Sequence, residues 1–245
     1  MICDQTERDI EQLRQWIDEC APGRMVFFGG AGVSTESGIP DFRSADGLYA
    51  QRYPYPPETM VSRSFFDARP REFFDFYCDR MLALNAAPNA AHRKLAELER
   101  EGTLSAVVTQ NIDGLHQKAG SREVLELHGS VLRNHCTRCG KFYGVERILG
   151  SRGIPRCTCG GVIKPDVVLY EESLDEDVLA RAIHYIRQAD MLIIGGTSLV
   201  VYPAAGLVQY YRGHKLAVIN KGGAGSGLGA AVTVDAPIGQ VLAQL

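Results

Sequence analysis

Short apolar runs alternate with segments of helical spacing along most of this chain, and this alternation constrains the fold more than any other feature. The apolar runs indicate buried strands at residues 25–28, 103–109, 167–169, 191–194, 215–219 and 232–234. Helical spacing separates them at about residues 5–21, 70–84, 89–101, 175–189 and 203–212. Strands that are apolar throughout and separated by helices are typical of a parallel sheet covered on both faces. We therefore expect an α/β fold with a Rossmann-like, doubly wound parallel sheet.

Four cysteines lie in two close pairs, Cys136/Cys139 and Cys157/Cys159, with 17 residues between the pairs. Four thiolates complete the tetrahedral shell of one Zn²⁺ ion and leave no position open for catalysis. The ion is therefore expected to be structural. Redox-active or bare thiols are the alternative interpretation of the same spacing.

The cysteine pairs lie in a loop-rich segment that interrupts the alternation at residues 131–165. We expect this segment to form a small zinc-binding module with one ion per chain. The remaining residues, 1–130 and 166–245, are expected to form one discontinuous large domain. His135 lies beside the first pair and is a less favoured substitute ligand.

The composition argues against several classes of function. The 245 residues carry a formal charge of −3 with a pI near 6.1, which does not favour a nucleic-acid or membrane surface. No apolar run approaches the roughly 20 residues that span a bilayer, and the N-terminus lacks the pattern of a signal peptide.

Three further cysteines, Cys3, Cys20 and Cys78, are scattered and leave an odd total. Free thiols beside a metal site indicate a reducing compartment, so we expect a cytoplasmic protein.

A glycine-rich loop follows the first strand, with Gly-Gly-Ala-Gly-Val-Ser at residues 29–34. Glycines at this place let backbone N–H groups approach a pyrophosphate, which the N-terminus of the next helix can attract. The spacing departs from the G-x-G-x-x-G pattern, so a tight turn explains the loop alone equally well. The residues that follow the loop favour nucleotide binding. Asp41 supplies a carboxylate, Phe42 an apolar side chain that can cover the ligand, and Arg43 a guanidinium that can bind a phosphate with two hydrogen bonds.

Polar residues also follow later strands. Gln-Asn-Ile-Asp at residues 110–113 follows the second strand, at the edge of a parallel sheet where ligands gather. These side chains can hydrogen-bond ribose hydroxyls and a carboxamide, or they can cap a helix that starts near Gly114. Both interpretations stay open from the residues alone. Gly-Thr-Ser at residues 196–198 and Asn220 end two further strands and can reach a second half of a nucleotide.

His128 is the strongest candidate for a catalytic base among the six histidines. It closes the apolar run at residues 124–127 and precedes Gly129, which places its imidazole at a strand end with space in front of it. An imidazole with an ordinary pKa near 6.5 can accept a proton at neutral pH. The other five histidines are expected to be surface residues or hydrogen-bonded core residues.

Taken together, these motifs resemble those of the sirtuins, the NAD-dependent protein lysine deacylases, and in length those of bacterial members. The resemblance rests on residues 30–34, 38–43, 109–113, 127–129, 196–198 and 218–220 and on the two cysteine pairs. Three positions depart from the family pattern. Gly29 replaces a frequent threonine, the second cysteine pair is one residue shorter than usual, and Leu169-Tyr170-Glu171 replaces a frequent Phe-Gly-Glu. None of these departures removes a catalytic group.

The resemblance implies that NAD⁺ binds across the strand ends. The implied cofactor-binding residues are Gly30, Ala31, Gly32, Ser34, Thr35, Ile39, Asp41, Phe42, Arg43, Gln110, Asn111, Ile112, Asp113, His128, Gly196, Thr197, Ser198 and Asn220. The implied catalytic residues are His128 and Asn111. The acyl oxygen of the substrate attacks the ribose and nicotinamide leaves. His128 then accepts a proton from the ribose hydroxyls, and water completes the release of free lysine and O-acyl-ADP-ribose.

By the same resemblance, the partner is an acylated-lysine protein or peptide. Its backbone would add as a strand between two segments that contain Val167, Val168, Leu169, Tyr170, Val200, Val201 and Tyr202. A mono-ADP-ribosyltransferase on the same scaffold is one alternative function. A non-catalytic module that senses NAD or binds proteins through its zinc site is another.

Acyl preference depends on Tyr77 and Arg80, one helical turn apart. They are similar to a Tyr-x-x-Arg pair that binds acidic acyl chains in desuccinylase-type sirtuins. We favour the simpler interpretation, in which Tyr77 belongs to a buried aromatic stripe and Arg80 is a solvated charge. Acetyl-lysine is then expected to be preferred over succinyl-lysine.

Overall fold

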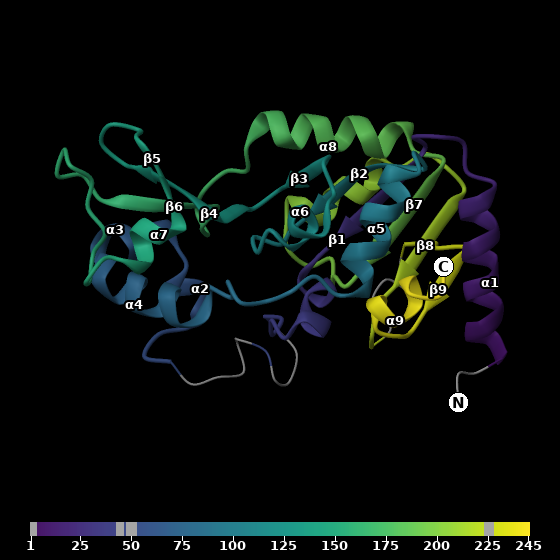
Figure 1. Cartoon of the computed structure of the whole chain (residues 1–245), viewed down its shortest axis with the longest axis horizontal. Coiled ribbons are helices and arrows are strands. Elements are labelled where there is room, and N and C mark those ends of the chain that lie inside the picture. Colours follow the sequence, from purple (N-terminus) through teal and green to yellow (C-terminus); the bar gives the residue numbers. More distant parts are fainter. Residues whose placement is uncertain (1–3, 43–46, 48–52, 223–227) are drawn as a thin grey trace.

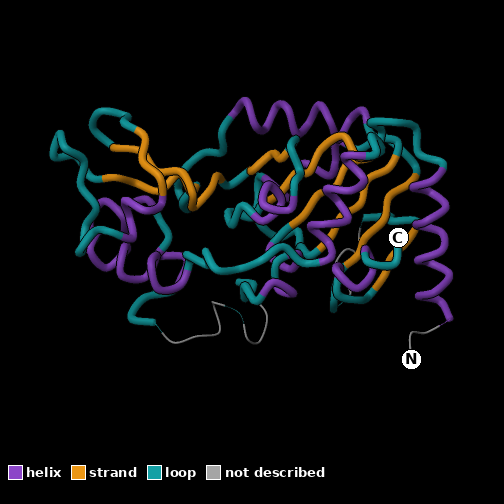
Figure 2. The backbone as a smooth tube through the Cα atoms, in the orientation of Figure 1, coloured by secondary structure: helices purple, strands orange, loops and turns teal. Residues whose placement is uncertain are grey.

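The structure is a computed structural model that describes residues 4–42, 47, 53–222 and 228–245. Two bodies lie next to each other along the long axis of the molecule (Figure 1). A sheet covered by helices forms the larger body, and a small antiparallel sheet with short helices forms the other (Figure 2). No helix in the described part combines the length and the apolar character needed to cross a bilayer.

The larger body contains a six-stranded sheet with the order β3-β2-β1-β7-β8-β9. Its strands are β1 (Met25–Gly29), β2 (Leu104–Thr109), β3 (Val124–Glu126), β7 (Met191–Gly195), β8 (Lys215–Ile219) and β9 (Val232–Val234). Every neighbouring pair is parallel. The order reverses between β1 and β7, which is the switch point of a doubly wound sheet. The expected Rossmann-like fold is confirmed.

Helices cover both faces of this sheet because its central strands are buried on both sides. In β1, Phe27 packs into one core, while Val26 and Phe28 pack into the other. The first core is closed by α1 (Asp4–Asp18), α5 (Ala90–Arg100) and α9 (Ile238–Leu242). The second is closed by α8 (Glu176–Gln188) and the 3-10 helix η4 (Ala204–Tyr210). Each buried aromatic side chain contributes about 2–3 kcal/mol to stability by the area it removes from water.

The smaller body has a core of its own. Its sheet has the order β5-β4-β6, formed by β4 (Gly129–Cys136), β5 (Phe142–Gly144) and β6 (Ile163–Val167), with α7 (Val145–Leu149) beside it. Three earlier helices pack into the same core: α2 (Pro57–Met60), α3 (Arg63–Ala68) and α4 (Pro70–Arg80). The expected division at residues 131 and 165 therefore describes only part of this second core.

One expectation about an individual element was wrong. Residues 167–169 are not a strand of the parallel sheet, because Val167 ends β6 and pairs antiparallel with Gly129 of β4. The helix expected at about residues 203–212 is present as the 3-10 helix η4 (Ala204–Tyr210). The segment before it, residues 199–202, is not a strand, and Leu199 has a φ of 54°, which no extended strand adopts.

Candidate active site

The carboxyl ends of the central strands bring the predicted site residues together. The glycine loop follows β1 and forms two short 3-10 turns, η1 (Ala31–Val33) and η2 (Thr35–Ser37). Residues 110–113 follow β2, His128 follows β3, and residues 196–198 follow β7. Since β1 lies between β2 and β7, these loops meet at the switch point of the sheet, where α/β proteins bind ligands.

Glycines are required where the loops after β1 and β7 touch. The Gly32 N–H donates to the Gly196 carbonyl at 2.8 Å. A Cβ on Gly32 would lie 2.8 Å from Gly196 Cα, and a Cβ on Gly30 would lie 2.8 Å from Thr197 Cβ. Gly196 also has a φ of +58°, which disfavours any residue with a side chain. The loop after β1 therefore makes a close backbone contact with the loop after β7, and we call this contact the glycine cradle.

A buried hydrogen-bond network joins the glycine loop to the loop after β2. The Ser34 hydroxyl donates to Asp113 Oδ2 at 2.6 Å and accepts from Asn111 Nδ2 at 3.0 Å. Ser34 is only 1 % exposed, so these bonds form away from water and hold both side chains in place. Asp113 Oδ1 also accepts from the Leu115 N–H at 2.9 Å, at the start of α6 (Leu115–Ala119). Asp113 thus caps a helix and faces the cavity at the same time.

His128 has a defined tautomer. Its Nδ1 lies 3.0 Å from the Gln110 carbonyl, which can only accept, so Nδ1 must carry the hydrogen. Nε2 is then left with a free lone pair. Burial lowers the pKa of His128, while the bond to Gln110 acts in the opposite direction. The imidazole is therefore neutral at pH 7 and able to accept a proton.

Gly129 sets the direction of the chain after this base. Its φ is +73°, and a Cβ there would collide with the backbone carbonyl of Asp166. The chain turns at this residue to leave the parallel sheet as β4. Residues 127–129 therefore hold both the candidate base, His128, and the glycine at which the chain passes from the larger body to the smaller one.

One cavity of about 260 Å³ collects most of the predicted residues. The predicted residues that line it are Ala31, Ser34, Ile39, Phe42, Gln110, Asn111, Ile112, Asp113, His128, Val167, Val168, Leu169, Tyr170, Val201 and Tyr202. They come from the loops after β1, β2, β3 and β6 and from the segment after β7. The residues expected to hold the nicotinamide half and the acyl-lysine therefore share one space between the two bodies.

The remaining predicted residues lie outside this cavity. Gly30, Gly32, Gly196 and Thr197 form the cradle at the strand ends, and Gln110 Nε2 donates to Thr197 Oγ1 at 3.0 Å. The others that do not line the cavity are Thr35, Asp41, Ser198, Val200 and Asn220. Arg43 lies outside the described residues.

Two glutamates to which the sequence analysis gave no role, Glu171 and Glu172, anchor the wall of the cavity. Glu172 accepts from the Leu169 N–H and from Lys164 Nζ, both at 2.9 Å. Glu171 accepts from the N–H and hydroxyl of Ser64 at 2.8 and 2.9 Å. Glu171 has a φ of 77°, so these bonds hold the segment in a conformation that a glutamate rarely adopts.

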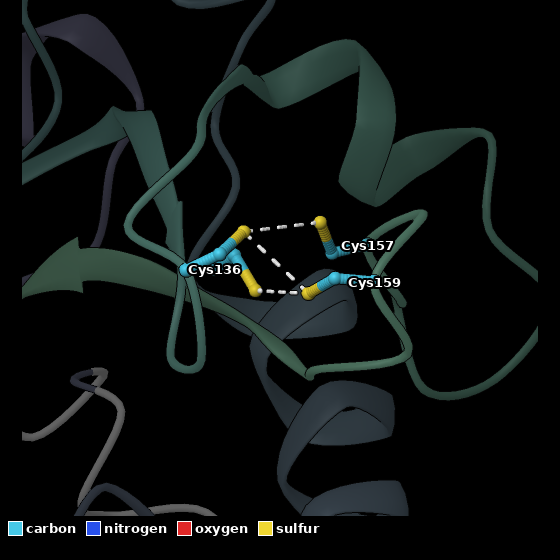
Figure 3. A group of neighbouring side chains, drawn as sticks. Cys136, Cys157 and Cys159 are labelled. Carbon is cyan, nitrogen blue, oxygen red and sulfur yellow. Dashed lines mark hydrogen bonds between the residues drawn. The ribbon is translucent and has the colours of Figure 1, made fainter.

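The four predicted cysteines meet in the smaller body. Their sulfur atoms lie within 4.8 Å of one another, and Figure 3 shows those of Cys136, Cys157 and Cys159 pointing inward. The Sγ–Sγ distances of 3.4, 3.5 and 3.6 Å approach the edge of about 3.8 Å that Zn–S bonds of ~2.3 Å give a tetrahedron. The cluster fits one structural zinc ion.

The charges of the thiols also require a cation. The backbone N–H of Cys159 and the Tyr143 hydroxyl lower the pKa of the Cys157 thiol to about 5. The backbone N–H of Lys141 lowers the pKa of Cys139, but the sulfur atoms of Cys159, Cys136 and Cys157 together outweigh it and raise this pKa to about 12. Four thiolates can form together only when a metal ion compensates their charge.

Tyr77 and Arg80 behave differently from each other. Tyr77 is 1 % exposed, stacks on Phe73 at 5.6 Å and does not line the cavity. Arg80 does line the cavity, but its guanidinium pairs with Asp79 at 2.6 Å and lies 5.8 Å from the centre of the Tyr53 ring. The two side chains thus do not face one acyl group together.

Residues 30–203 match the family model described as the Sir2 family, and the chain belongs to this family. Similar proteins include an NAD-dependent protein deacetylase of Clostridium perfringens, 58% identical over 90% of this chain and 92% of that protein. A second, from Cutibacterium acnes, bears the same name and is 53% identical over 95% of both chains.

Solved Sir2 structures share the fold of the whole chain. One with a deacetylated p53 peptide and 3′-O-acetyl-ADP-ribose superposes with a TM-score of 0.87 at 37% identity and covers 96% of both chains. Another, with a p53 peptide and NAD⁺, has a TM-score of 0.83 at 38% identity and covers 95% of both chains.

Proposed function

We propose that this protein is an NAD-dependent protein lysine deacetylase that transfers the acyl group to ADP-ribose. The observation that carries this conclusion is the convergence of a glycine cradle, the Ser34–Asp113–Asn111 network and neutral His128 on one cavity. The family and its named deacetylase relatives support the same function.

NAD⁺ supplies a ribose carbon that takes the acyl oxygen when nicotinamide leaves. The residues fit this molecule, because the polar Gln110, Asn111 and Asp113 line the same cavity as the apolar Ala31 and Phe42. Asn111 and Asp113 are proposed to position the nicotinamide amide, held by Ser34. Phe42, which lines the cavity, is proposed to exclude water.

His128 is proposed to accept the proton of a ribose hydroxyl at Nε2. The Gln110 carbonyl keeps the hydrogen on Nδ1, so the lone pair of Nε2 is available whenever the ring is neutral. A general base of this kind contributes about 10²–10⁴-fold to a rate. Burial lowers the pKa of His128, so the ring stays neutral and able to accept a proton at pH values below the ordinary pKa of histidine.

The acylated lysine is proposed to enter between residues 167–170 and Val201–Tyr202, all of which line the cavity. The Leu169 N–H is bound by Glu172 and the Tyr170 N–H by the Val61 carbonyl. We therefore expect residues 167–170 to offer the substrate backbone fewer free N–H groups than the resemblance to the family implies. Apolar contact with the lysine stem is proposed to provide much of the affinity.

We also propose a cytoplasmic location, since Cys20 and Cys78 are free and the zinc thiolates need a reducing environment. The proposed zinc module comprises residues 131–165 together with the helices of residues 57–80 that share its core. A mono-ADP-ribosyltransferase would use the same cradle and His128, so it is the second candidate. A non-catalytic NAD-sensing or protein-binding module would have no need of the base.

The function is tested with purified protein, an acetyl-lysine peptide and NAD⁺, with peptide mass followed over time. The peptide should lose its acetyl group only when NAD⁺ is present, and free nicotinamide should appear at the same rate. Deacetylation without NAD⁺, or nicotinamide release that does not depend on the acetyl group, would contradict the proposal.

A further inference from the structure

The part of the zinc module that holds the cysteines, residues 131–165, carries a charge opposite to that of the rest of the chain. This segment contains seven lysines and arginines and a single acidic residue, Glu146, for a formal charge of +6. The other 210 residues contain 19 basic and 28 acidic residues, for a formal charge of −9. The small net charge of the whole chain is therefore the sum of one basic segment and an otherwise acidic chain.

Two of the seven cations are used within the fold. Arg133 pairs with Glu126 at 2.7 Å and with Asp166 at 2.9 Å, and Lys164 pairs with Glu172 at 2.9 Å. The other five are exposed and form no ion pair with any described residue: Arg138, Lys141, Arg147, Arg152 and Arg156. We call these five residues the basic face.

Three guanidinium groups of the basic face gather around one loop. Arg138 donates to the Cys159 carbonyl at 2.9 Å, Arg156 to the Gly160 carbonyl at 3.0 Å, and Arg147 to the carbonyl of Arg156 itself. These bonds hold the side chains close together. Each guanidinium has five N–H donors, so most of them stay free for a partner.

Neutralisation of the zinc cluster does not account for the basic face. One Zn²⁺ with four thiolates has a net charge of −2, and Arg138 already lies there, its backbone N–H 3.4 Å from Cys136 Sγ. Two cations would balance that charge, and five are present in addition to the two that form ion pairs. Like charges held together on a surface repel one another unless a partner of opposite charge binds.

Exposed apolar side chains lie in the same module. Phe142 is 57% exposed at the start of β5, and Leu149 is 54% exposed at the end of α7. The Phe142 ring contacts the exposed His135 ring at 5.5 Å between centroids. Arginine together with exposed aromatic residues is typical of protein–protein interfaces.

We propose that the basic face docks an acidic segment of the acylated protein substrate, separate from the residues that enter the cavity. The proposal rests on the function proposed above. An acidic polypeptide segment fits better than a nucleic acid, because the rest of the chain, with a formal charge of −9, repels a long polyanion. The exposed Phe142 and Leu149 also suit a polypeptide.

The path of the chain connects this face to the chemistry. β6 runs from the second cysteine pair to Val167, and the next residues, Val168 to Tyr170, line the cavity. A segment bound to the module therefore keeps an acyl-lysine of the same polypeptide near the cavity. Such tethering raises the effective concentration of the acyl-lysine and lowers its KM without changing the chemical step.

The test compares two acetyl-lysine peptides that are identical except for a tail on a flexible linker. One tail is a run of glutamates with one leucine, and the other replaces each glutamate with glutamine. With the full chain at low ionic strength, the glutamate tail should lower KM about tenfold and leave kcat unchanged, as several weak ion pairs would together give. The difference should vanish in Lys141→Gln/Arg147→Gln/Arg152→Gln and at about 0.5 M salt.

A matched variant controls for general charge. Arg100→Gln/Arg122→Gln/Arg212→Gln removes three exposed cations from the larger body and should keep the full effect of the tail. Equal KM values for the two tails in the wild-type protein would overturn the proposal. So would an effect of the tail that survives in the zinc-module variant. Zinc content and turnover of the glutamine-tailed peptide show that the variant is folded.

Direct binding separates this proposal from the proposed function. A labelled glutamate tail without acyl-lysine should bind the wild-type protein and not the zinc-module variant, as measured by fluorescence anisotropy. That result would support docking even if no peptide were deacetylated. A single-stranded DNA oligonucleotide that binds the same face more tightly at equal salt would overturn the assignment to a polypeptide.

Discussion

His128 receives its position from the backbone and its reactivity from burial. The Gln110 carbonyl fixes the tautomer, and loss of water lowers the pKa of the ring. Neither effect requires a neighbouring carboxylate. The chain turn directly after His128 depends on the positive φ of Gly129, so the position of the base depends on this glycine.

We predict that His128→Ala lowers kcat by at least about 100-fold, the usual contribution of a general base, and leaves NAD⁺ affinity within about threefold. His184→Ala, which changes an exposed histidine of α8, should retain wild-type turnover. Steady-state kinetics and calorimetric titration with NAD⁺ measure the two effects. A His128→Ala protein with a tenth or more of the wild-type kcat would show that another group is the base.

Acyl preference can be tested at Arg80. Because Tyr77 is buried and Arg80 pairs with Asp79, we predict that kcat/KM for an acetylated peptide exceeds that for the succinylated peptide by about tenfold or more. Arg80→Met should change neither value by more than about threefold, since an exposed pair contributes little. Succinyl activity above acetyl activity, with a selective loss in Arg80→Met, would assign the arginine to the acyl group instead.

At the scale of elements, the zinc cluster connects the strands β4 and β6 and packs with helices that come much earlier in the chain. Cys136 and Cys157 belong to the same core as Phe66 and Phe73. Loss of the metal should therefore affect α3 and α4 as well as the cysteine loops. The cavity wall at Val167 would lose its support in consequence.

We predict about one zinc ion per chain by elemental analysis, and a strong chelator should lower Tm and abolish activity together. Cys159→Ser should reproduce both effects because it removes one ligand. Cys78→Ser, a matched change at an exposed free cysteine, should keep zinc, Tm and activity. A folded and active protein without zinc would rule out a structural ion.

The parallel sheet and the metal ligands could be predicted because they leave local patterns. Apolar strands such as Met25–Gly29 and cysteine pairs at ligand spacing need no knowledge of distant contacts. Residues 167–169 were misassigned because an apolar run does not reveal which sheet it joins. The turn after β7, with Leu199 at positive φ, could not be predicted, because a leucine gives no local signal for that conformation.

Other contacts of the site could not be predicted, because no local sequence pattern marks the residues that form them. Ser64 binds Glu171 across more than 100 residues of sequence, and both side chains are ordinary surface types. The helices of residues 57–80 share a core with residues 131–165, where Phe66 and Phe73 belong to the same buried cluster as Cys136 and Ile163. A helical stripe predicts burial but not the partner against which it is buried.

At the scale of the whole molecule, a pair of buried histidines makes stability depend on pH. The His92 and His116 rings lie 4.7 Å apart between α5 and α6. Burial lowers the pKa of His92 to about 4, against the attraction of Asp113, and burial and then His92 lower the pKa of His116 to about 3. Both rings are neutral in the fold, whereas unfolded histidine titrates near 6.5.

These histidines contribute stability above pH 6.5 and lose it as pH falls toward 4 and then 3, because the unfolded chain binds protons that the fold excludes. The expected slope is at most about 2.7 kcal/mol per pH unit for two sites. Urea unfolding at pH 7 and pH 5 measures this loss. His116→Leu should remove about half of it, and an unchanged slope in that variant would show that other groups cause the acid sensitivity.

The two bodies and the cavity between them define an enzyme that consumes NAD⁺, and the products identify its reaction. The most direct measurement is mass spectrometry of all products from NAD⁺ and an acetyl-lysine peptide. Nicotinamide, deacetylated peptide and O-acetyl-ADP-ribose should form in equal amounts, and O-acetyl-ADP-ribose should form at least about 100-fold more slowly with His128→Ala. A peptide or protein that gains ADP-ribose, with its acetyl group retained, would contradict a deacetylase and identify a mono-ADP-ribosyltransferase.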